Sequence, residues 1–363
     1  MTAGCGGNQT VPVNRASLTA ATSFPASTTG SLTAGPRKVT ITEFPGPKHK
    51  PSLLCCIVSK GAELSFGYIY ADGKTYVGQM TAKGVISGEQ ALSISGTMDL
   101  APGPGNSVAY STVNANLVNT VGLVTAGGAT SYALAGECTD AFVATGSDGN
   151  LWTCGQIGPV GAPVIDRVTT HGSVTPFNAF PASAPKGATL FAIAPGPDGA
   201  LWYVGCTAGG AGPLIGRMTT AGIVTDFSAA AQSAGAHCPV SIVAGPDGAM
   251  WFADPNSSFA STGRDAIGRV TRAGKVKVKE YVLSSGTNFT YPNSITAGPD
   301  GALWFTEAQV PAIGRITTKG KITRYTAGIT KGAFPNAITT GPDGSLWFTE
   351  YKTWKIGRVS IRP

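Results

Sequence analysis

Three acidic side chains stand at equivalent places in a repeated segment and could together hold a metal ion. Asp254, Glu307 and Glu350 each end an apolar, Trp-containing run in three successive copies of that segment. If these runs are neighbouring strands, the carboxylates should project toward one mouth of the fold, near Asn293 and Asn336. Carboxylate and amide oxygens are the ligands that Mg²⁺ and Ca²⁺ prefer. The alternative is that the three residues are solvated strand ends.

Proton transfer at the same mouth would need a titratable side chain. Of the three histidines, His49 and His171 fall in segments expected elsewhere, whereas His237 falls at the same rim. We therefore treat His237, Glu307 and Glu350 as weak candidates for a catalytic acid or base. The alternative for His237 is a solvated loop histidine.

Aromatic residues near the same place could bind an organic ligand. Tyr291 and Phe334 precede Asn293 and Asn336 closely, and Trp354 follows the last Trp-containing run. Aromatic faces beside amide groups suit an apolar or sugar-like ligand, so the sequence predicts a small molecule, a peptide or a glycan as partner. Packing between repeated units would also account for the aromatic residues.

The elements that would position these residues come from a segment that recurs seven times along the chain. Its clearest copies contain Gly-Pro-Asp-Gly, an apolar pair with Trp, then Ile-Gly-Arg and Thr-Thr-x-Gly. A period of about 40–50 residues is typical of propeller blades or of a solenoid. The copies begin near Val58, Gly103, Gly146, Gly196, Gly245, Gly298 and Gly341.

The residue types favour a propeller. Pro-Asp-Gly at 299–301 suits a tight hairpin, and Leu303 and Trp304 put bulk on both faces of one run, as radially stacked blades require. We therefore predict an all-β, seven-bladed β-propeller of four-stranded antiparallel blades over residues 38–363. The sixth copy contains four short runs rich in β-branched and aromatic residues, at 294–297, 303–307, 312–317 and 321–325.

The N-terminal end of region 38–363 supplies a strand that its C-terminal end lacks. The seventh copy ends at 356–363 without a fourth run, while 38–44 matches 321–325 in type and length. We expect the N-terminal strand to pair onto blade seven and close the ring, which removes an open sheet edge. The alternative is an unrelated exposed strand.

Residues 1–37 are rich in Thr, Ser, Ala, Gly and Pro, which predicts a flexible leader or tether. The segment 3–8, with Cys5 after small residues, resembles the end of a bacterial lipoprotein signal, so Cys5 is a candidate for lipidation and membrane attachment. The alternative is a free thiol in a plain N-terminal segment. We expect an exported bacterial protein of the cell envelope, a periplasmic or outer-membrane lipoprotein, or a secreted protein.

The remaining cysteines permit disulfides. Strand ends at one rim make the pairs Cys138–Cys154 and Cys206–Cys238 geometrically acceptable. Adjacent Cys55 and Cys56 lie in an apolar run, where buried thiols are expected. No Cys/His spacing typical of a zinc site occurs.

Loop lengths separate the two rims of the expected ring. The Gly-Pro-Asp-Gly and Thr-Thr-x-Gly hairpins hardly vary, whereas 255–265 is much longer than the equivalent 308–311. We call the rim that carries the uniform hairpins the bottom rim and the other the top rim. Binding sites on a rigid scaffold usually develop among variable loops, so the top rim is where we expect function.

The segment 297–320, Ala-Gly-Pro-Asp-Gly-Ala-Leu-Trp-Phe-Thr-Glu followed by Ile-Gly-Arg-Ile-Thr-Thr-Lys-Gly, resembles the virginiamycin B lyase (streptogramin B lyase) family. The resemblance covers about 38–363 and is strongest from 146 onward. It implies a seven-bladed propeller and a magnesium-dependent opening of a cyclic depsipeptide by elimination at an ester. It also implies a site of His residues that follow Pro at the start of first strands, with nearby glutamates.

This chain departs from that pattern at the implied site. Tyr291-Pro292-Asn293 and Phe334-Pro335-Asn336 carry Asn at both His positions, and Phe334 stands where a Glu is implied. Asn transfers no proton near neutral pH, and an elimination needs a base. We therefore expect an extracytoplasmic ligand-binding or interaction scaffold. The alternative is a metal-dependent carbon–oxygen lyase, or a lactonase-like hydrolase, that uses the acidic top rim with Mg²⁺ or Ca²⁺.

The net charge of +7 comes largely from lysines that fall on outer strands and hairpins, with few aromatic residues between them. That distribution argues against nucleic-acid binding and suits solvated faces or an anionic envelope surface. We expect a monomer.

Overall fold

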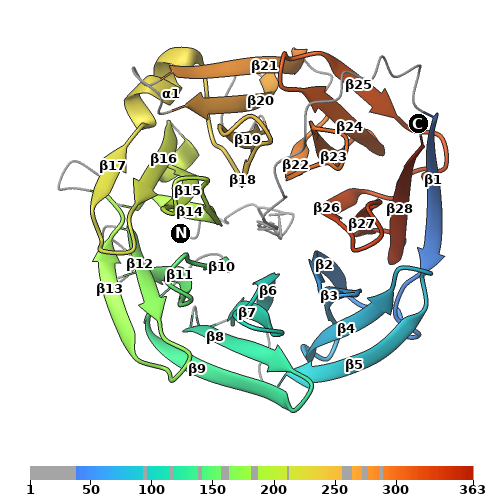
Figure 1. Cartoon of the computed structure of the whole chain (residues 1–363), viewed down its shortest axis with the longest axis horizontal. Helices are drawn as coiled ribbons and strands as arrows, with labels where there is room; N and C mark the ends of the chain where they lie inside the picture. The colour runs from blue at the N-terminus through green and yellow to red at the C-terminus, as the bar shows by residue number, and fades with distance from the viewer. Residues whose placement is uncertain are drawn as a thin grey trace, which may run out of the picture.

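The computed structural model describes residues 38–362 except 93–95, 115, 117, 138–140, 157–162, 181–186, 211, 256–263, 272–276 and 286–288. Within these residues the chain forms seven four-stranded antiparallel sheets arranged as blades around a ring (Figure 1). The predicted seven-bladed β-propeller is thus confirmed. The leader 1–37, with Cys5, lies outside the described residues and stays a prediction.

Each of the first six blades is a meander of consecutive strands, from the innermost strand to the outermost. Blade one comprises β2 (Leu53–Lys60), β3 (Glu63–Ile69), β4 (Thr75–Thr81) and β5 (Ile86–Leu92). Blade two comprises β6 (Thr97–Pro102), β7 (Val108–Val113), β8 (Val118–Thr125) and β9 (Gly128–Glu137). Blade three comprises β10 (Val143–Thr145), β11 (Leu151–Gln156), β12 (Pro163–Val168) and β13 (Val174–Asn178).

The second half of the ring repeats the plan. Blade four comprises β14 (Thr189–Pro195), β15 (Leu201–Cys206), β16 (Pro213–Met218) and β17 (Val224–Asp226). Blade five comprises β18 (Ser241–Ala244), β19 (Met250–Asp254), β20 (Arg264–Thr271) and β21 (Lys277–Ser285). Blade six comprises β22 (Pro292–Ala297), β23 (Ala302–Glu307), β24 (Ala312–Thr317) and β25 (Ile322–Tyr325). The short helix α1 (Ser228–Ala234) and the 3-10 turn η1 (Ala208–Gly210) both belong to the connections of blade four.

Blade seven joins the two ends of the chain. It comprises β26 (Pro335–Thr340), β27 (Leu346–Glu350), β28 (Lys355–Arg362) and, outermost, β1 (Lys38–Pro45). β1 pairs antiparallel with β28 from Lys38↔Arg362 to Pro45↔Lys355, and Figure 1 shows blue β1 beside red β28. The predicted closure by the N-terminal strand is confirmed.

In blades four to seven, the Gly-Pro-Asp-Gly hairpin at the bottom rim ties neighbouring strands of the blade together. In blade six, Gly301 has φ 72°, a backbone conformation that favours glycine. Asp300 Oδ1 accepts a hydrogen bond from Trp304 Nε1 at 2.9 Å, and its Oδ2 accepts one from Arg315 Nε at 2.7 Å. The hairpin Asp therefore holds the second and third strands through Trp and the Arg of Ile-Gly-Arg. The same ion pair recurs as Asp198–Arg217, Asp247–Arg269 and Asp343–Arg358.

The Gly of Ile-Gly-Arg makes room for an aromatic ring. A Cβ at Gly314 would lie 2.1 Å from the ring of Phe305, so only glycine lets that ring lie flat across β24. The ring and its equivalents Phe252 and Phe348 are fully buried. The Ile-Gly-Arg motif therefore serves packing within the blade. It does not constrain the residues at the strand ends of the top rim.

Cysteine chemistry agrees with the sequence where it can be compared. Cys206, at the end of β15, forms a disulfide with Cys238, which precedes β18. Cys55 and Cys56 are buried free thiols. Cys138 lies outside the described residues, so the pair with Cys154 stays a prediction. None of the helices in the described part of the chain is long and apolar enough to cross a membrane.

Candidate functional site

The inner strands of blades six and seven begin with a bulge that carries the two Asn residues of interest. The pairing of β22 with β23 shifts between Pro292 and Ile295, and that of β26 with β27 shifts between Pro335 and Ile338. A bulge inserts an unpaired residue and redirects its side chain. Asn293 and Asn336 lie in these bulges and are only 2% and 3% exposed.

The two amides are hydrogen-bonded to each other across the blades. Asn293 Nδ2 donates to Asn336 Oδ1 at 2.5 Å and to the Asn336 carbonyl at 3.3 Å. Asn336 Nδ2 in turn donates to the Cys55 carbonyl on β2 of blade one, at 2.8 Å. Within the described residues, Asn293 Oδ1 has no hydrogen-bond partner. The amide pair therefore links three neighbouring inner strands and leaves one buried acceptor open.

Three aromatic residues of the top rim share an unusual backbone conformation. Tyr291, Phe334 and Trp354 have φ of 56°, 60° and 53°, and they are the non-glycine residues with positive φ in the described part of the chain. Such a conformation costs about 1–3 kcal/mol per residue and persists only where surrounding contacts enforce it. All three side chains are half-buried. Three of the five residues predicted to bind a ligand thus have a strained backbone, each in a different segment of the top rim.

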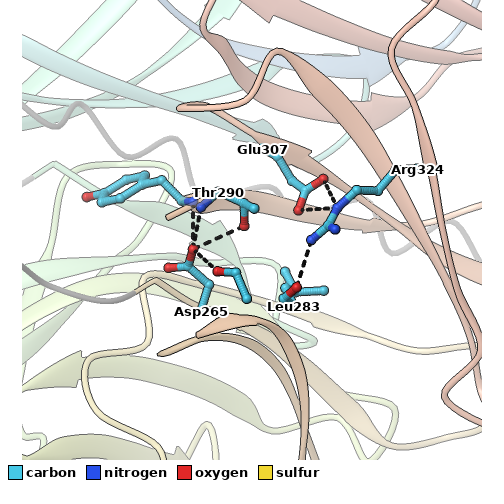
Figure 2. Close-up of polar contacts among 7 residues, drawn as sticks. Asp265, Leu283, Thr290, Glu307 and Arg324 are labelled. Carbon is cyan, nitrogen blue, oxygen red and sulfur yellow. Dashed lines mark hydrogen bonds and ion pairs between the residues drawn. The ribbon is translucent and has the colours of Figure 1, made fainter. Parts of the chain in front are cut away.

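Asp265 enforces this conformation at Tyr291. Its Oδ2 accepts hydrogen bonds from the backbone N–H of Thr290 at 2.5 Å and of Tyr291 at 3.1 Å, and from the hydroxyls of Thr290 and Ser284 (Figure 2). Asp265 is fully buried at the start of β20. The sequence pattern did not single it out because the repeat assigns it to the long linker 255–265, whereas the structure places it in β20. The available signal was an acidic residue directly before the Ile-Gly-Arg strand of blade five.

Glu307, at the end of β23, is held inside its own blade. Both of its carboxylate oxygens accept from Arg324 Nε on the outer strand β25, at 2.7 and 2.9 Å. Arg324 Nη2 donates to the Leu283 carbonyl at 3.0 Å, so the ion pair also fastens β21 of blade five (Figure 2). Glu307 is fully buried. A charge-assisted pair of this kind is strong and holds the carboxylate toward the outer strand.

Asp254, at the end of β19, caps a turn instead. Its Oδ2 accepts from the His237 N–H and its Oδ1 from the Cys238 N–H, each at 2.8 Å. Burial and the nearby Glu280 charge raise the pKa of Asp254 well above its usual value. His237 itself is half-buried, and among the described residues its Nδ1 has no hydrogen-bond partner. No hydrogen bond in the described part joins the His237 ring to the amide pair.

Glu350, at the end of β27, meets a second carboxyl group on the closing strand. Thr353 Oγ1 donates to Glu350 Oε2, and the Glu350 carboxyl lies against that of Glu43 on β1. Burial, with the Glu43 charge, raises the pKa of Glu350 to about 8. Burial also disfavours the charged form of Glu43, but hydrogen bonds from Lys355 and Thr330 outweigh it and lower the Glu43 pKa to about 2. The pair therefore shares one proton near neutral pH.

The expected convergence of Asp254, Glu307 and Glu350 is not what the structure has. Each carboxyl group is turned to a partner in its own blade or the preceding turn, and the described residues contain no group of three His, Cys, Asp or Glu that could hold a metal ion. Glu307 and Glu350, at the ends of second strands, reach the outer strands of their blades, whereas Asp254 accepts from the turn before β18. The metal-binding role of Asp254, Glu307 and Glu350 stays a prediction.

Comparisons with known proteins agree with the fold and the repeats. The model of the virginiamycin B lyase family matches residues 21–258 and 254–362. A solved structure of a streptogramin B lyase is 26% identical, covers 89% of this chain and 98% of its own, and has a TM-score of 0.70. The virginiamycin B lyase of Staphylococcus aureus is 24% identical, covers 89% of this chain and 99% of its own, and has a TM-score of 0.70.

Proposed function

The chain belongs to the virginiamycin B lyase family, and on that premise we propose that it is a ligand-binding propeller of the extracytoplasmic space rather than an enzyme that opens a depsipeptide ring. The ligand site we propose lies at the top rim where β22, β26 and β2 begin. The ligand is a small molecule, a peptide or a glycan.

The observation that carries this proposal is the Asn293–Asn336 pair. The family resemblance implies His at both positions, where a proton must be taken from a carbon atom. Here both residues are buried amides instead, and Asn293 Nδ2 donates a hydrogen bond to Asn336 Oδ1 at 2.5 Å. An amide neither accepts nor gives a proton near neutral pH, but it recognises hydrogen-bonding groups well. The open acceptor Asn293 Oδ1 supports recognition of a ligand N–H or O–H group.

The surrounding residues support binding as well. Tyr291 and Phe334 are half-buried and are held in a costly backbone conformation. Aromatic faces beside a few oriented polar groups are typical of ligand sites. The Cys206–Cys238 disulfide supports an oxidising location outside the cytoplasm, and membrane attachment through Cys5 remains part of the proposal.

The test is a thermal-shift screen of saccharides, short peptides and aromatic heterocycles on the purified protein. Binding to the native state raises its apparent stability, by an amount set by ligand concentration and Kd. We expect a ligand that raises the melting temperature of the wild type and not of Asn293→Leu. Asn119→Leu is the matched control, since Asn119 is a fully buried amide of blade two. Equal shifts for all three proteins, or no ligand at millimolar concentration, would refute the proposal.

One observation favours the enzymatic alternative, a carbon–oxygen lyase or a lactonase-like hydrolase. Glu350 pairs in register with Pro335, directly before Asn336, and its pKa of about 8 gives a carboxyl group that can exchange a proton near neutral pH. The protein should be incubated with a streptogramin B and Mg²⁺ and the products separated by chromatography with fragment-ion mass spectrometry. We expect an intact ring. Ring opening that is lost in Glu350→Gln would establish the alternative.

A further inference from the structure

Cys55 and Cys56 touch each other in a way that a regular strand does not allow. Successive side chains of a strand point to opposite faces of the sheet. Here the pairing of β2 with β3 shifts between Leu54 and Cys56, so Cys55 is the extra residue of a bulge. The two Sγ atoms consequently lie 2.7 Å apart on one face, and both residues are at most 1% exposed.

The neighbouring strand is shaped to receive both sulfur atoms. Gly67 on β3 has no side chain, and a Cβ there would lie 2.5 Å from Cys56 Sγ and 3.0 Å from Cys55 Sγ. Cys55 Sγ also donates to the Gly67 carbonyl at 3.2 Å. The two sulfurs therefore fill one common space that any larger residue at position 67 would close.

The disulfide between Cys206 and Cys238 indicates the redox conditions under which the protein folds. Cys206 and Cys238 form a disulfide, and such bonds persist in oxidising compartments. Burial raises the pKa of the Cys56 thiol well above its usual value, so the folded protein offers little thiolate for exchange. Any oxidation of this pair must therefore take place during folding, while β2 is still accessible.

We propose that Cys55 and Cys56 are a redox modification site, joined by a vicinal disulfide in the protein that has folded under oxidising conditions. Two S–H bonds break and one S–S bond forms, and the two protons and two electrons pass to a disulfide oxidant, which is reduced to two thiols. This proposal does not depend on the ligand-binding function.

The bond would restrain the peptide that supports the amide pair. The Cys55 carbonyl accepts hydrogen bonds from Asn336 Nδ2 at 2.8 Å and from Thr349 Oγ1 at 3.2 Å. Closing a ring between Cys55 and Cys56 limits the rotation of that carbonyl. The oxidation state of blade one is thereby coupled to the position of Asn336 in blade seven.

The test is thiol mapping of the full chain exported into an oxidising compartment. The denatured protein is alkylated with N-ethylmaleimide without reductant, digested with trypsin and analysed by mass spectrometry. We expect the peptide 49–60, which contains residues 51–60 because trypsin does not cleave before Pro51, to carry no adduct, to be lighter by two hydrogen atoms than its reduced form, and to gain two adducts after reduction. The linked Cys206–Cys238 peptides in the same digest show that conditions were oxidising.

Two adducts on 51–60 without reduction, while Cys206–Cys238 is linked, would overturn the proposal, as would a crosslink from either cysteine to a third. Cys56→Ser is the control, and its peptide should carry one adduct with or without reduction. Hydrogen exchange over 333–340 measures the coupling. We expect reduction to accelerate exchange there in the wild type and to leave it unchanged in Cys56→Ser, and equal rates in the oxidised and reduced wild type would refute the coupling.

Discussion

Replacing Glu350 by Gln should make the stability of this propeller much less sensitive to alkaline pH. The Glu350 carboxyl is fully buried against Glu43 on the closing strand, and its pKa lies at about 8 instead of the usual 4.5. A Gln side chain keeps the shape of the protonated acid and can still accept from Thr353 and donate to Glu43. It cannot ionise, so the repulsion between two buried carboxylates never develops.

Proton linkage gives the sign and the size of this effect on the free energy of unfolding. A carboxyl group with a raised pKa binds its proton more tightly in the folded state, so it lowers the free energy of unfolding as pH rises from 4.5 to 8 and changes it little beyond. Each tenfold difference in proton affinity is worth about 1.4 kcal/mol. The rise of the Glu350 pKa from 4.5 to about 8 therefore lowers the free energy of unfolding of the wild type by about 4–5 kcal/mol at alkaline pH. Glu350→Gln avoids this loss.

The measurement is urea-induced unfolding of both proteins at several pH values between 4.5 and 8.5. The free energy of unfolding of Glu350→Gln minus that of the wild type should be near zero at pH 4.5, should grow steadily with pH, and should level off above pH 8. Glu307→Gln is the matched control, because it changes the same strand position in blade six, where the partner is Arg324. The two differences from the wild type are compared at each pH. A flat difference for Glu350→Gln would refute the shared proton.

Three further outcomes test the packing around the site. Arg324→Ala leaves the buried Glu307 carboxylate unpaired and should cost about 3–5 kcal/mol in urea unfolding, more than Lys321→Ala on the same hairpin. Asp265→Ala removes every acceptor that holds Thr290 and Tyr291 and should cost about 2–4 kcal/mol, and unchanged hydrogen exchange at 289–293 would contradict its anchoring function. Deleting residues 1–45 should lower the melting temperature well below that of the 1–37 deletion, since only the longer deletion removes β1, and equal values would argue against closure.

The ring itself could be read from the sequence because its cause is local and repeated. Each of the last four copies carries its own hairpin Gly, its Trp and its Ile-Gly-Arg, and the missing fourth run of the last copy pointed directly to the strand at 38–45. Cys206–Cys238 could be anticipated for the same reason, since both residues end or precede strands at one rim. Periodicity determines which rim a residue reaches.

The candidate site could be predicted only in part, because periodicity does not determine which neighbour a side chain meets. Glu307 meets Arg324, and Glu350 meets Glu43, only because the outer strand brings those residues to the same face at the same height. Asn293 and Asn336 meet because both inner strands begin with a bulge, which no residue type announces. Asp265 is found only once β20 is seen to bring its carboxylate to the backbone of Tyr291.

The pairing of the first strand with the last also sets an order of events for the newborn chain. Glu43 of β1 is bonded to Thr330, 287 residues further along, and to Lys355 of β28. Six blades can be assembled from neighbouring segments as they emerge during synthesis, whereas β1 has no partner until the final strand has been made. The N-terminal strand must therefore wait unpaired through almost the whole of translation, and contacts between distant segments form slowly. Ring closure is then the last step of maturation, and a truncated chain that lacks β28 leaves β1 as an unpaired edge for other chains to capture.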